Sequence, residues 1–473
     1  MKTKTYLFIL MAMISVLSLQ ATSRYVKISG SDSNDGISWA TAKLTVTAAL
    51  TASVSGDVIY VAQGTYETTT GFNMKNGVNV YGGYDDATGL RDIVNYETIL
   101  RKTGTADARV LNSAVMTIET IFDGFTITGG NRSTGGSGAS LNTLCTLSNC
   151  KITGNGGVLA GSGGGVLMTN TSKLLNCIVE NNTSGGSAAV FSSSSTDQVV
   201  IENCIIRNNK AASVGGVSLR GSSVMKNCII ANNEATTNNI GGLSLREASK
   251  VFNCTIVNNK TILSSSTAGG IYMIDQSTIQ NCIVWNNNSQ EPVINRGGTA
   301  TMITCAVQSS PAAGSFLLNA TNTEVDGPNF VAPSTTIGNT TEDQSSINWH
   351  LVEGSPCINT GTDLTSLGVS ADILGVSRPA GSGFDIGAYE EAITGVLDIK
   401  KSDVLTIYPS PSNNVVKINM GNISSVNVFD MTGAAVPVNY YNSQVDISSL
   451  AKGIYTFVIK ANNKNYVARA IKN

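Results

Sequence analysis

The sequence predicts an all-β protein in which a parallel β-helix is followed by a small β-sandwich. Two phrases alternate along the middle of the chain, and neither has helical periodicity. One phrase joins Asn-Cys to an aliphatic residue two positions after the Cys and to a further Asn, and the other is Gly-Gly followed by aliphatic residues. A recurrence every 20–50 residues or so is typical of stacked repeats. The first phrase places its cysteines at Cys150, Cys177, Cys204, Cys228, Cys254 and Cys282, which are 27, 27, 24, 26 and 28 residues apart.

Each period contains at least two short runs rich in β-branched residues, and turns of Gly, Asn and Ser separate these runs. Such a unit cannot bury its apolar face without neighbours. One period is therefore predicted to be one coil of the β-helix. The repeated asparagines suit left-handed backbone positions at the corners, and their amides can stack into ladders, so we interpret them as structural.

Alternation within the Asn-Cys phrase assigns its faces. The Cys and the residue two positions later are always apolar, whereas the third position after the Cys has no common chemistry. Because side chains along a strand alternate between faces, the first pair is predicted to point inward. The position directly after the Cys points outward and is often Ile, as at Ile178 and Ile283. This stripe is either a binding surface or is covered by loops or the next turn, and we favour cover because isolated surface apolar residues are ordinary.

Composition excludes several partner classes. Only 13% of the 473 residues are charged and the formal net charge is −2, which argues against nucleic acid and against acidic membrane surfaces. Lys2 and Lys4 precede the apolar run Tyr6–Leu19, and small residues at 21–23 follow. Residues 1–23 are therefore expected to form a cleaved signal peptide. No later run approaches the roughly 18 apolar residues of a transmembrane span.

Nine cysteines in an exported protein raise the question of disulfides. In-register strands lie about 4.8 Å apart with parallel Cβ vectors, whereas a disulfide needs about 3.5–4.5 Å between Cβ atoms. Reduced, stacked thiols are therefore expected. The chain has no Cys-x-x-Cys pair and a single histidine, so the sequence predicts no metal site and no cofactor.

Both ends of the β-helix, residues 24–392, need cover. Residues 24–85 are predicted to form an N-terminal cap whose helix, Ala40–Ala52, closes the first coil. Residues 346–392 are predicted to close the other open end, with Trp349 and Tyr389 supplying much of the buried area. Arg378 is expected to pair with Asp385 or Asp372 in this closing segment.

The opening residues resemble the start of right-handed parallel β-helix proteins of the pectate-lyase-like superfamily. The coil phrases are similar to the repeats of polymorphic outer-membrane adhesins, although Ile or Val stands where those repeats have Phe. Together these resemblances cover roughly residues 24–310, and they imply a right-handed β-helix rather than a particular activity. The matching opening residues are Tyr25-Val26, Asp35-Gly36, Ser38-Trp39, Gly56-Asp57, Val61–Tyr66 and Tyr81-Gly82-Gly83.

After a linker at 393–403, residues 404–473 show short alternating strands that predict the small β-sandwich. Their motifs resemble the C-terminal sorting domain of the type IX secretion system of Bacteroidota, with Ser410 where that family usually has Asn. The resemblance implies export by the signal peptide, periplasmic transit, contact with the secretion machinery, and release or attachment at the outer-membrane surface. The alternative is a C-terminal binding sandwich. The expected sorting-signal residues are Pro409, Leu450, Lys452, Gly453 and Tyr455.

Two classes of function remain. A polysaccharide lyase or glycosidase would need paired carboxylates, or a calcium site beside a basic residue such as Arg207. The acids of the coils do not recur at one position, and His350 is interpreted as structural, so we assign no catalytic residue. We favour the second class, a non-catalytic adhesin-like or glycan-binding protein whose partner is a glycan or a surface protein. The possible ligand contacts are Trp285, Tyr272 and Arg207.

Overall fold

The computed structural model divides the chain into two compact units, Met1–Ala392 and Ile393–Asn473. Each unit is described by itself. The structure describes residues 21–157, 161–237, 240–262, 268–288, 293–295, 299–308, 316–317, 327–391, 407–408, 412–418, 423–430, 434–441, 443–461 and 464–473.

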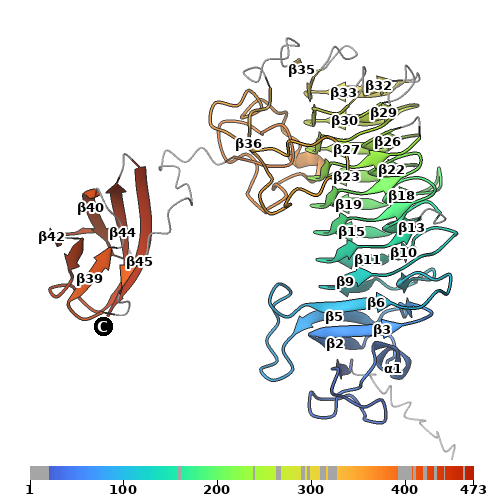
Figure 1. Ribbon diagram of the computed structural model, residues 1–473, viewed down its shortest axis with the longest axis horizontal. Coiled ribbons are helices and arrows are strands. Elements are labelled where there is room, and N and C mark those ends of the chain that lie inside the picture. The colour runs from blue at the N-terminus through green and yellow to red at the C-terminus, as the bar shows by residue number, and fades with distance from the viewer. Residues whose placement is uncertain are drawn as a thin grey trace, which may run out of the picture. The chain divides into compact units, whose positions relative to one another are not determined.

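The first unit is a parallel β-helix with three sheets along its length (Figure 1). In the described residues its first sheet has 11 strands, and the apolar residues at the strand centres stack in register, as Leu147 does on Leu174 and Leu174 on Ile201. The strands in spatial order are β1 (Ser23–Val26), β2 (Val58–Ala62), β5 (Asn79–Tyr84), β8 (Thr120–Asp123), β11 (Cys145–Ser148), β15 (Lys173–Leu175), β19 (Val200–Glu202), β23 (Val224–Lys226), β27 (Lys250–Phe252), β30 (Thr278–Gln280) and β33 (Thr301–Ile303).

The second sheet carries the Asn-Cys phrase, and it also has 11 strands within the described ranges. The residue two positions after each Cys is fully buried, as at Ile152, Val179 and Ile206, so the predicted inward face is confirmed. The strands are β3 (Gly64–Thr68), β6 (Thr98–Lys102), β9 (Thr126–Thr128), β12 (Lys151–Thr153), β16 (Ile178–Glu180), β20 (Ile205–Arg207), β24 (Ile229–Ala231), β28 (Thr255–Val257), β31 (Ile283–Trp285), β34 (Ala306–Val307) and β35 (Phe316–Leu317).

The third sheet carries the Gly-Gly phrase and ends each coil before the chain returns to the first sheet. A short sheet formed by β13 (Gly156–Gly157), β17 (Thr183–Ser184), β21 (Lys210–Ala211) and β25 (Glu234–Ala235) bridges the second and third sheets along the chain. The third-sheet strands are β4 (Phe72–Asn73), β7 (Leu111–Asn112), β10 (Ala139–Leu141), β14 (Val166–Met168), β18 (Val190–Ser192), β22 (Val217–Leu219), β26 (Leu243–Leu245), β29 (Ile271–Met273) and β32 (Val293–Asn295).

Asparagine turns the chain at the corners of each coil, as expected. Between the first and second sheets, Asn176, Asn203 and Asn227 adopt left-handed φ angles of 53°, 54° and 49°. Deeper asparagines form a buried ladder: the Asn182 amide nitrogen donates to Asn209 Oδ1 at 3.0 Å and to a backbone carbonyl at 2.9 Å. Each buried amide is thereby hydrogen-bonded within the stack, which avoids the penalty of an unpaired polar group.

All nine cysteines are free and buried, which agrees with the expectation of stacked, reduced thiols. Each thiol in the ladder contacts the coil before it. For example, the backbone N–H of Cys150 donates to Cys177 Sγ at 3.4 Å, and that of Cys177 donates to Cys204 Sγ at 3.4 Å. Burial raises the pKa of thiols such as Cys228 and Cys254.

The helix of the N-terminal cap is shorter than the predicted Ala40–Ala52. Helix α1 spans Val46–Ala52, because Lys43 instead bridges to the first strand and Thr45 caps the helix by accepting the Ala48 N–H at 3.1 Å. Buried Val46 and Leu50 join the core at the first coil, so the covering role of the helix is confirmed.

Residues 1–20, which make up most of the predicted signal peptide, lie outside the described residues. Strand β1 begins at Ser23, and the Val58 N–H donates to the Thr22 carbonyl at 3.1 Å. The expected cleavage before Arg24 would remove the first residue of that strand, and the boundary stays a prediction. No helix among the described residues is long and apolar enough to span a membrane.

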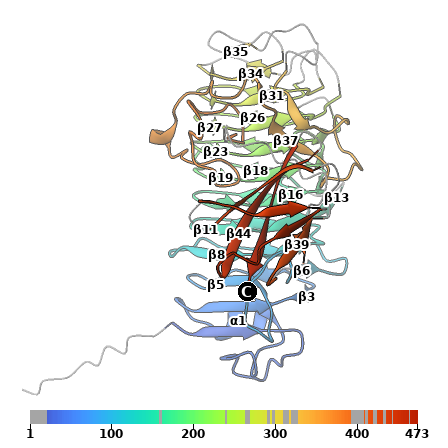
Figure 2. The same cartoon turned by 90° about the vertical axis from the view of Figure 1, so that its left-hand side faces the viewer.

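The closing segment does not cap the second open end, so that prediction was wrong. Residues 327–391, here called the strap, lie along the outer face of the second sheet beside its later coils (Figures 1 and 2). Its regular elements are β36 (Phe330–Ala332), the antiparallel β37 (Asn348–Leu351) and the 3-10 turn η2 (Thr365–Leu367).

The strap covers the outward isoleucine stripe, as the favoured interpretation of that stripe required. Ile229 and Ile283, each 1% exposed, pack in one cluster with Trp349 and Leu351 of the strap. In an earlier coil the equivalent Ile178 remains half-buried. The apolar character of the later coils therefore explains why the strap lies on the side of the stack.

Corner asparagines of the second sheet fasten the strap along both edges. At one edge of the sheet, the Asn208 side-chain nitrogen donates to the Thr340 carbonyl at 2.8 Å, and that of Asn258 donates to the Ser334 carbonyl at 2.8 Å. At the other edge Asn253 donates to the Asp385 carbonyl at 2.9 Å. The strap thus pairs its backbone with side chains that the repeat supplies once per coil.

Arg378 pairs with neither predicted carboxylate. Its Nη1 donates to Glu390 Oε2 at 2.6 Å, and both side chains are fully buried. The Asp385 side chain instead accepts the backbone N–H groups of Asn359 and Glu391. Burial raises the pKa of Asp385 to about 6, against the effect of these hydrogen bonds. Asp372 accepts the Glu390 N–H.

The second unit is the expected β-sandwich. One four-stranded antiparallel sheet contains β38 (Ile407–Tyr408), β39 (Val415–Ile418), β43 (Gln444–Asp446) and β42 (Asn439–Tyr441) within the described ranges. The other contains β41 (Ala435–Val436), β40 (Ile423–Phe429), β44 (Gly453–Ala461) and β45 (Lys464–Lys472). Apolar residues from both sheets, including Val416, Val445, Phe457 and Ile459, form its core.

The expected sorting-signal residues have different environments. Gly453 begins β44, Tyr455 is 7% exposed and donates from its hydroxyl to the Ala451 carbonyl at 3.0 Å, and Leu450 packs against the core. Lys452 is exposed. Pro409 and the linker 393–403 lie outside the described residues.

We predict that the native protein resists a thiol reagent such as DTNB, because the reactive species is the thiolate and every thiol is buried. Unfolding in guanidinium should release all nine thiols for reaction. Rapid labelling of the folded protein would contradict the inward orientation of the cysteine ladder.

Replacing Ile283 by Ala should loosen the strap. The change truncates a buried side chain at the interface between the strap and the second sheet, and should destabilise the packing of the strap by about 2–4 kcal/mol. Denaturant unfolding and proteolysis within residues 327–391 measure this loss. Ile178→Ala is the matched control, since it occupies the same coil position without strap cover, and we expect less than about 1 kcal/mol. Equal losses for both variants would show that the strap does not cover the stripe.

Glu390→Gln should destabilise the first unit by about 3–5 kcal/mol, because it leaves a buried guanidinium without its counter-charge. Thermal and chemical unfolding measure the loss. Glu353→Gln, an exposed charge on the same strap, serves as the control and should change stability by less than about 0.5 kcal/mol. Wild-type stability of the Glu390 variant would refute the assigned pairing.

Candidate ligand-binding groove

The three predicted ligand contacts do not come together. Arg207 in β20 and Trp285 in β31 lie on the outer face of the second sheet, three coils apart. Tyr272 lies in β29 of the third sheet. Each has different neighbours, so the structure describes three separate environments.

Arg207 is engaged in an ion-pair network. Its Nε donates to Glu180 Oε2 at 2.8 Å, while Lys151 Nζ contacts the other carboxylate oxygen at 2.9 Å. Burial alone would raise the pKa of Glu180, but the hydrogen bonds and charges of the two cations outweigh it and lower this pKa. Arg207 also donates to the Gln344 carbonyl of the strap at 3.5 Å. The guanidinium is thus neutralised and used in packing.

Tyr272 packs against apolar residues of neighbouring coils. Its ring, like that of Phe191, borders the small buried cluster that includes Val214 and Ile240. The Arg246 guanidinium lies 6.0 Å from the ring centroid, in cation–π range. Tyr272 is thus half-buried and in contact with other residues of the coils.

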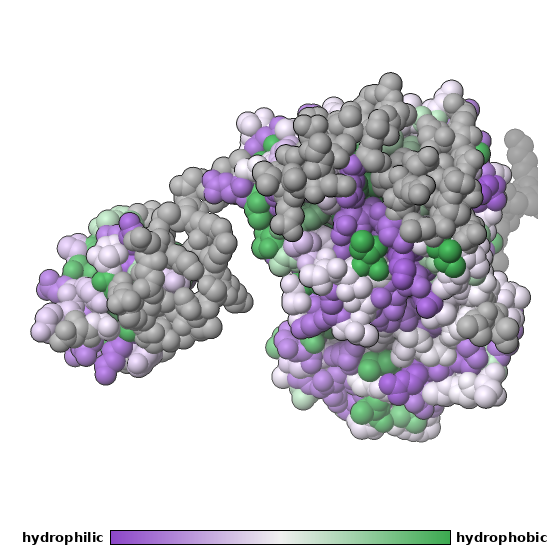
Figure 3. Space-filling view, turned by 45° about the horizontal axis from the view of Figure 1, so that its top comes forward, coloured by the Kyte–Doolittle hydropathy of each residue, from purple (hydrophilic) through white to green (hydrophobic). Residues whose placement is uncertain are grey.

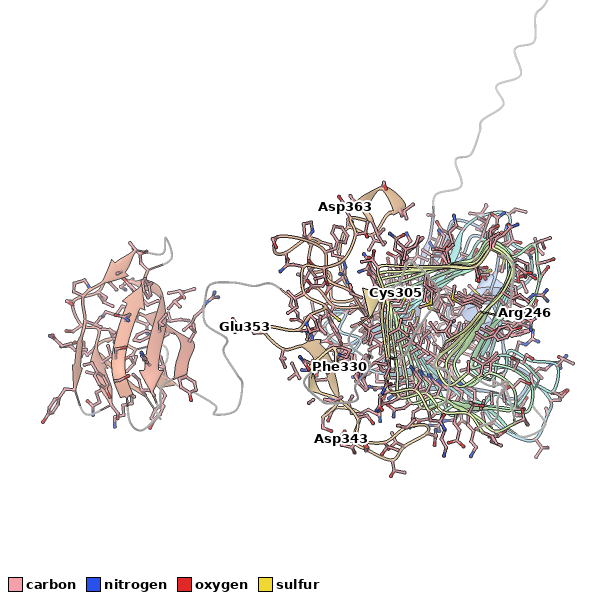
Figure 4. All side chains as sticks on the ribbon, turned by 90° about the horizontal axis from the view of Figure 1, so that it is seen from above. Arg246, Cys305, Phe330, Asp343, Glu353 and Asp363 are labelled. Atoms are coloured by element: carbon pink, nitrogen blue, oxygen red, sulfur yellow. The ribbon has the colours of Figure 1, made fainter. Side chains whose placement is uncertain are left out.

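Trp285 lines a groove between the second sheet and the strap. The groove has a volume of about 780 Å³. Phe330 and Trp349 reach it from the strap, with their ring centroids 5.1 Å apart in an edge-to-face arrangement. Figure 4 places Phe330 outside the stacked coils and Cys305 within them. The described lining residues are Asn258, Trp285, Asn286, Gln308, Gly327, Pro328, Asn329, Phe330, Pro333, Ser334, Trp349 and Val352.

Amide groups fix the polar side of the groove. The Asn286 N–H donates to Gln308 Oε1 at 2.6 Å, and its side-chain nitrogen donates to Asn258 Oδ1 at 2.9 Å. A Cβ added at Gly327 would lie 3.2 Å from the Trp285 ring, so the strap backbone passes close to the indole. The ring thereby lies beside the strap backbone and remains partly exposed.

The sequence analysis identified Trp285 but not the groove. Phe330 belongs to a Pro- and Ser-rich stretch with no strand pattern, and Trp349 was expected only as packing in an end cap. The contact between these residues depends on where the strap docks, which the repeat pattern does not encode. The one available signal was that two of the three tryptophans in the sequence, Trp285 and Trp349, belong to this region.

Several carboxylates on the coils make structural contacts. Glu247 pairs with Arg220 at 2.7 Å, Glu234 lies 3.5 Å from Lys210, and the buried Asp197 accepts the Ser194 N–H at 2.7 Å. Among the described residues, no group of three or more His, Cys, Asp and Glu side chains could hold a metal ion.

His350 is the only histidine in the sequence. Its ring stacks on Tyr389 with 3.8 Å between centroids, and its Nδ1 lies 2.9 Å from Glu391 Oε1. Glu391 Oε1 also accepts the Leu351 N–H at 2.9 Å, so this carboxylate ties β37 to the end of the strap.

On the face shown in Figure 3, hydrophobic residues form small separate patches within a mainly hydrophilic surface. Such scattered apolar residues are normal for a soluble surface and mark no large docking face. The groove beside Trp285 is therefore the best-defined candidate site in the part of the chain that the structure describes.

Comparisons with known proteins agree with both units. Residues 73–261 match the family model described as right handed beta helix region, and residues 406–473 match the model described as secretion system C-terminal sorting domain. The chain matches no curated protein sequence.

Several solved structures are partly similar to this chain. The crystal structure of pectate lyase Pel9A shows 16% sequence identity to this chain. The match covers 78% of this chain and 96% of that chain, with a TM-score of 0.46. A rhamnogalacturonan lyase is 15% identical, with coverages of 76% and 99% and a TM-score of 0.40. At these identities and scores, no activity is transferred to this chain.

The sorting domain indicates export, with release or retention at the cell surface, and contact with the secretion machinery. The expectations for fold, for a type IX secretion sorting domain and for a secreted or surface location are thus confirmed, while the signal peptide stays a prediction. The chain is a right-handed parallel β-helix protein that carries a C-terminal sorting domain of the type IX secretion system.

Proposed function

We propose that this exported protein is a non-catalytic glycan-binding protein, and that the groove beside Trp285 is its binding site. The observation that carries the proposal is a partly exposed indole set among amide side chains in a groove of about 780 Å³. Pockets of roughly 300–1,000 Å³ are the usual size for small-molecule and oligomer fragments.

The composition of the groove suits a sugar. One face of a pyranose ring carries C–H groups that pack on an aromatic ring, while its edge carries hydroxyls that need hydrogen-bond partners. Trp285 and Phe330 offer the aromatic surface, and Asn286, Gln308 and Asn329 offer amides that both donate and accept. The hydrogen bonds that join Asn258, Asn286 and Gln308 position these amides before a ligand arrives, which reduces the ordering that binding would otherwise require.

The distribution of charge supports binding without cleavage. Hydrolysis or elimination requires a carboxylate pair or a basic residue that is free to transfer a proton. Glu180, Glu234 and Glu247 each have a cationic partner on their own or an adjoining coil, and Arg207 has a carboxylate partner. These ion pairs hold the coils together, so their charges are committed to structure.

Trp285→Ala should weaken binding of the recognised oligosaccharide about tenfold or more, since a stacked aromatic ring in a binding site contributes on the order of 1.4 kcal/mol or more. Glycan-array screening identifies the ligand and calorimetry measures the affinity. Tyr272→Ala is the matched control, because it also removes a half-buried outward ring but on the third sheet.

Proteolysis of the strap should be unchanged in the Trp285 variant, which separates lost binding from lost folding. Unchanged affinity for Trp285→Ala would refute the groove as the site. Release of new chain ends from any polysaccharide, abolished by Arg207→Ala, would replace the proposal with a polysaccharide-cleaving enzyme.

A further inference from the structure

The groove beside Trp285 contains no charged side chain among its described lining residues. Its walls consist of amides, a hydroxyl, prolines, aliphatic groups and aromatic rings. The described lining residues differ in this respect from earlier coils of the same sheet, which carry Lys151, Glu180 and Arg207.

A bound uronate would bring a carboxylate into this groove. Removing a carboxylate from water is unfavourable unless a cation or several hydrogen-bond donors replace the lost hydration. Proteins usually recognise carboxylates with arginine, often through two parallel hydrogen bonds. No described lining residue can supply such a contact.

The side-chain donors that remain are all neutral: amides, the Ser334 hydroxyl and the indole N–H groups of Trp285 and Trp349. Several of the amides already make hydrogen bonds within the fold. Asn258 donates to the Ser334 carbonyl at 2.8 Å, and Asn286 donates to Asn258 at 2.9 Å. Arg207 occupies the position equivalent to Trp285 in its own coil. It lies three coils away, and Glu180 neutralises its charge. Among its described lining residues, the groove therefore offers stacking surfaces and neutral hydrogen-bond donors, but no counter-charge.

We infer that the ligand is a neutral oligosaccharide or polysaccharide, not a polyuronate or another acidic glycan. The inference rests on the proposed glycan-binding function and specifies the chemical class that this groove accepts. Discrimination against acidic chains arises because their carboxylate would lose water without gaining a partner.

The test compares the full-length protein with two sets of length-matched oligosaccharides. One set is neutral, such as xylo-, manno- and gluco-oligosaccharides, and the other is acidic, such as galacturonate and mannuronate oligomers. We expect the neutral ligand to bind at least about tenfold more tightly than any acidic one, a preference of a size that one unpaired buried charge readily produces. Its affinity should change less than about twofold between 50 and 500 mM NaCl, because no charge pair is formed.

Two substitutions at one lining position sharpen the result. Gln308→Lys should raise the affinity for acidic oligosaccharides severalfold in a salt-sensitive manner, while Gln308→Glu, of similar size, should not. Unchanged proteolysis of residues 327–391 establishes that both variants retain the strap. Failure of the lysine variant to improve acidic binding would contradict the argument from charge.

The outcomes separate the two claims. Tight binding of an acidic glycan to the wild type, lost in Trp285→Ala, would overturn the inference of neutrality and leave the groove as a glycan site. No binding by either set, or binding that Trp285→Ala leaves intact, would instead remove the proposed function on which the inference rests.

Discussion

The structure depends on the stacking of identical positions from one coil to the next. Parallel strands place each inward aliphatic residue over its counterpart, as Ile206 lies between Val179 and Ile230 in the second sheet. The buried asparagine and cysteine ladders add a polar constraint, because each accepts backbone N–H groups from the adjoining coil. A slip by one residue would turn every one of these side chains outward and leave their partners unpaired.

The same stacking determines what the outer surface can become. The position after each cysteine forms a straight column, and the strap buries its later members Ile229, Thr255 and Ile283, where the Thr255 hydroxyl accepts the Ala388 N–H of the strap. Corner asparagines at both edges then provide one side-chain donor per coil for the strap backbone. A groove arises where this added layer meets β31 at Trp285, so the candidate site is a consequence of lateral docking on a repetitive face.

Much of the coil could be predicted from sequence because its determinants are local and repeated. The period, the inward Cys-x-aliphatic step and the left-handed asparagines each recur once per coil, and the structure confirms them. The length of α1 was harder, since Lys43 pairs with a strand and the hydroxyl of Thr45 sets the first helical turn. Local helix preference alone does not reveal that competition.

The strap and the groove could not be predicted, because they depend on contacts between distant segments that occur only once. Arg378 has three carboxylates within reach in sequence, and the fold of the strap decides in favour of Glu390. Likewise, Trp285 could be recognised as an outward residue. Its neighbours Phe330 and Trp349 belong to the strap, which docks on the outer face of the second sheet around Ile283.

The most direct test of this account is a crystal structure of the protein with a bound oligosaccharide identified by array screening. The account predicts electron density for a sugar ring against the Trp285 indole, between β31 and residues 327–352 of the strap. Density on a different sheet, or a strap that caps the end of the coils and leaves Ile229 and Ile283 facing solvent, would contradict it.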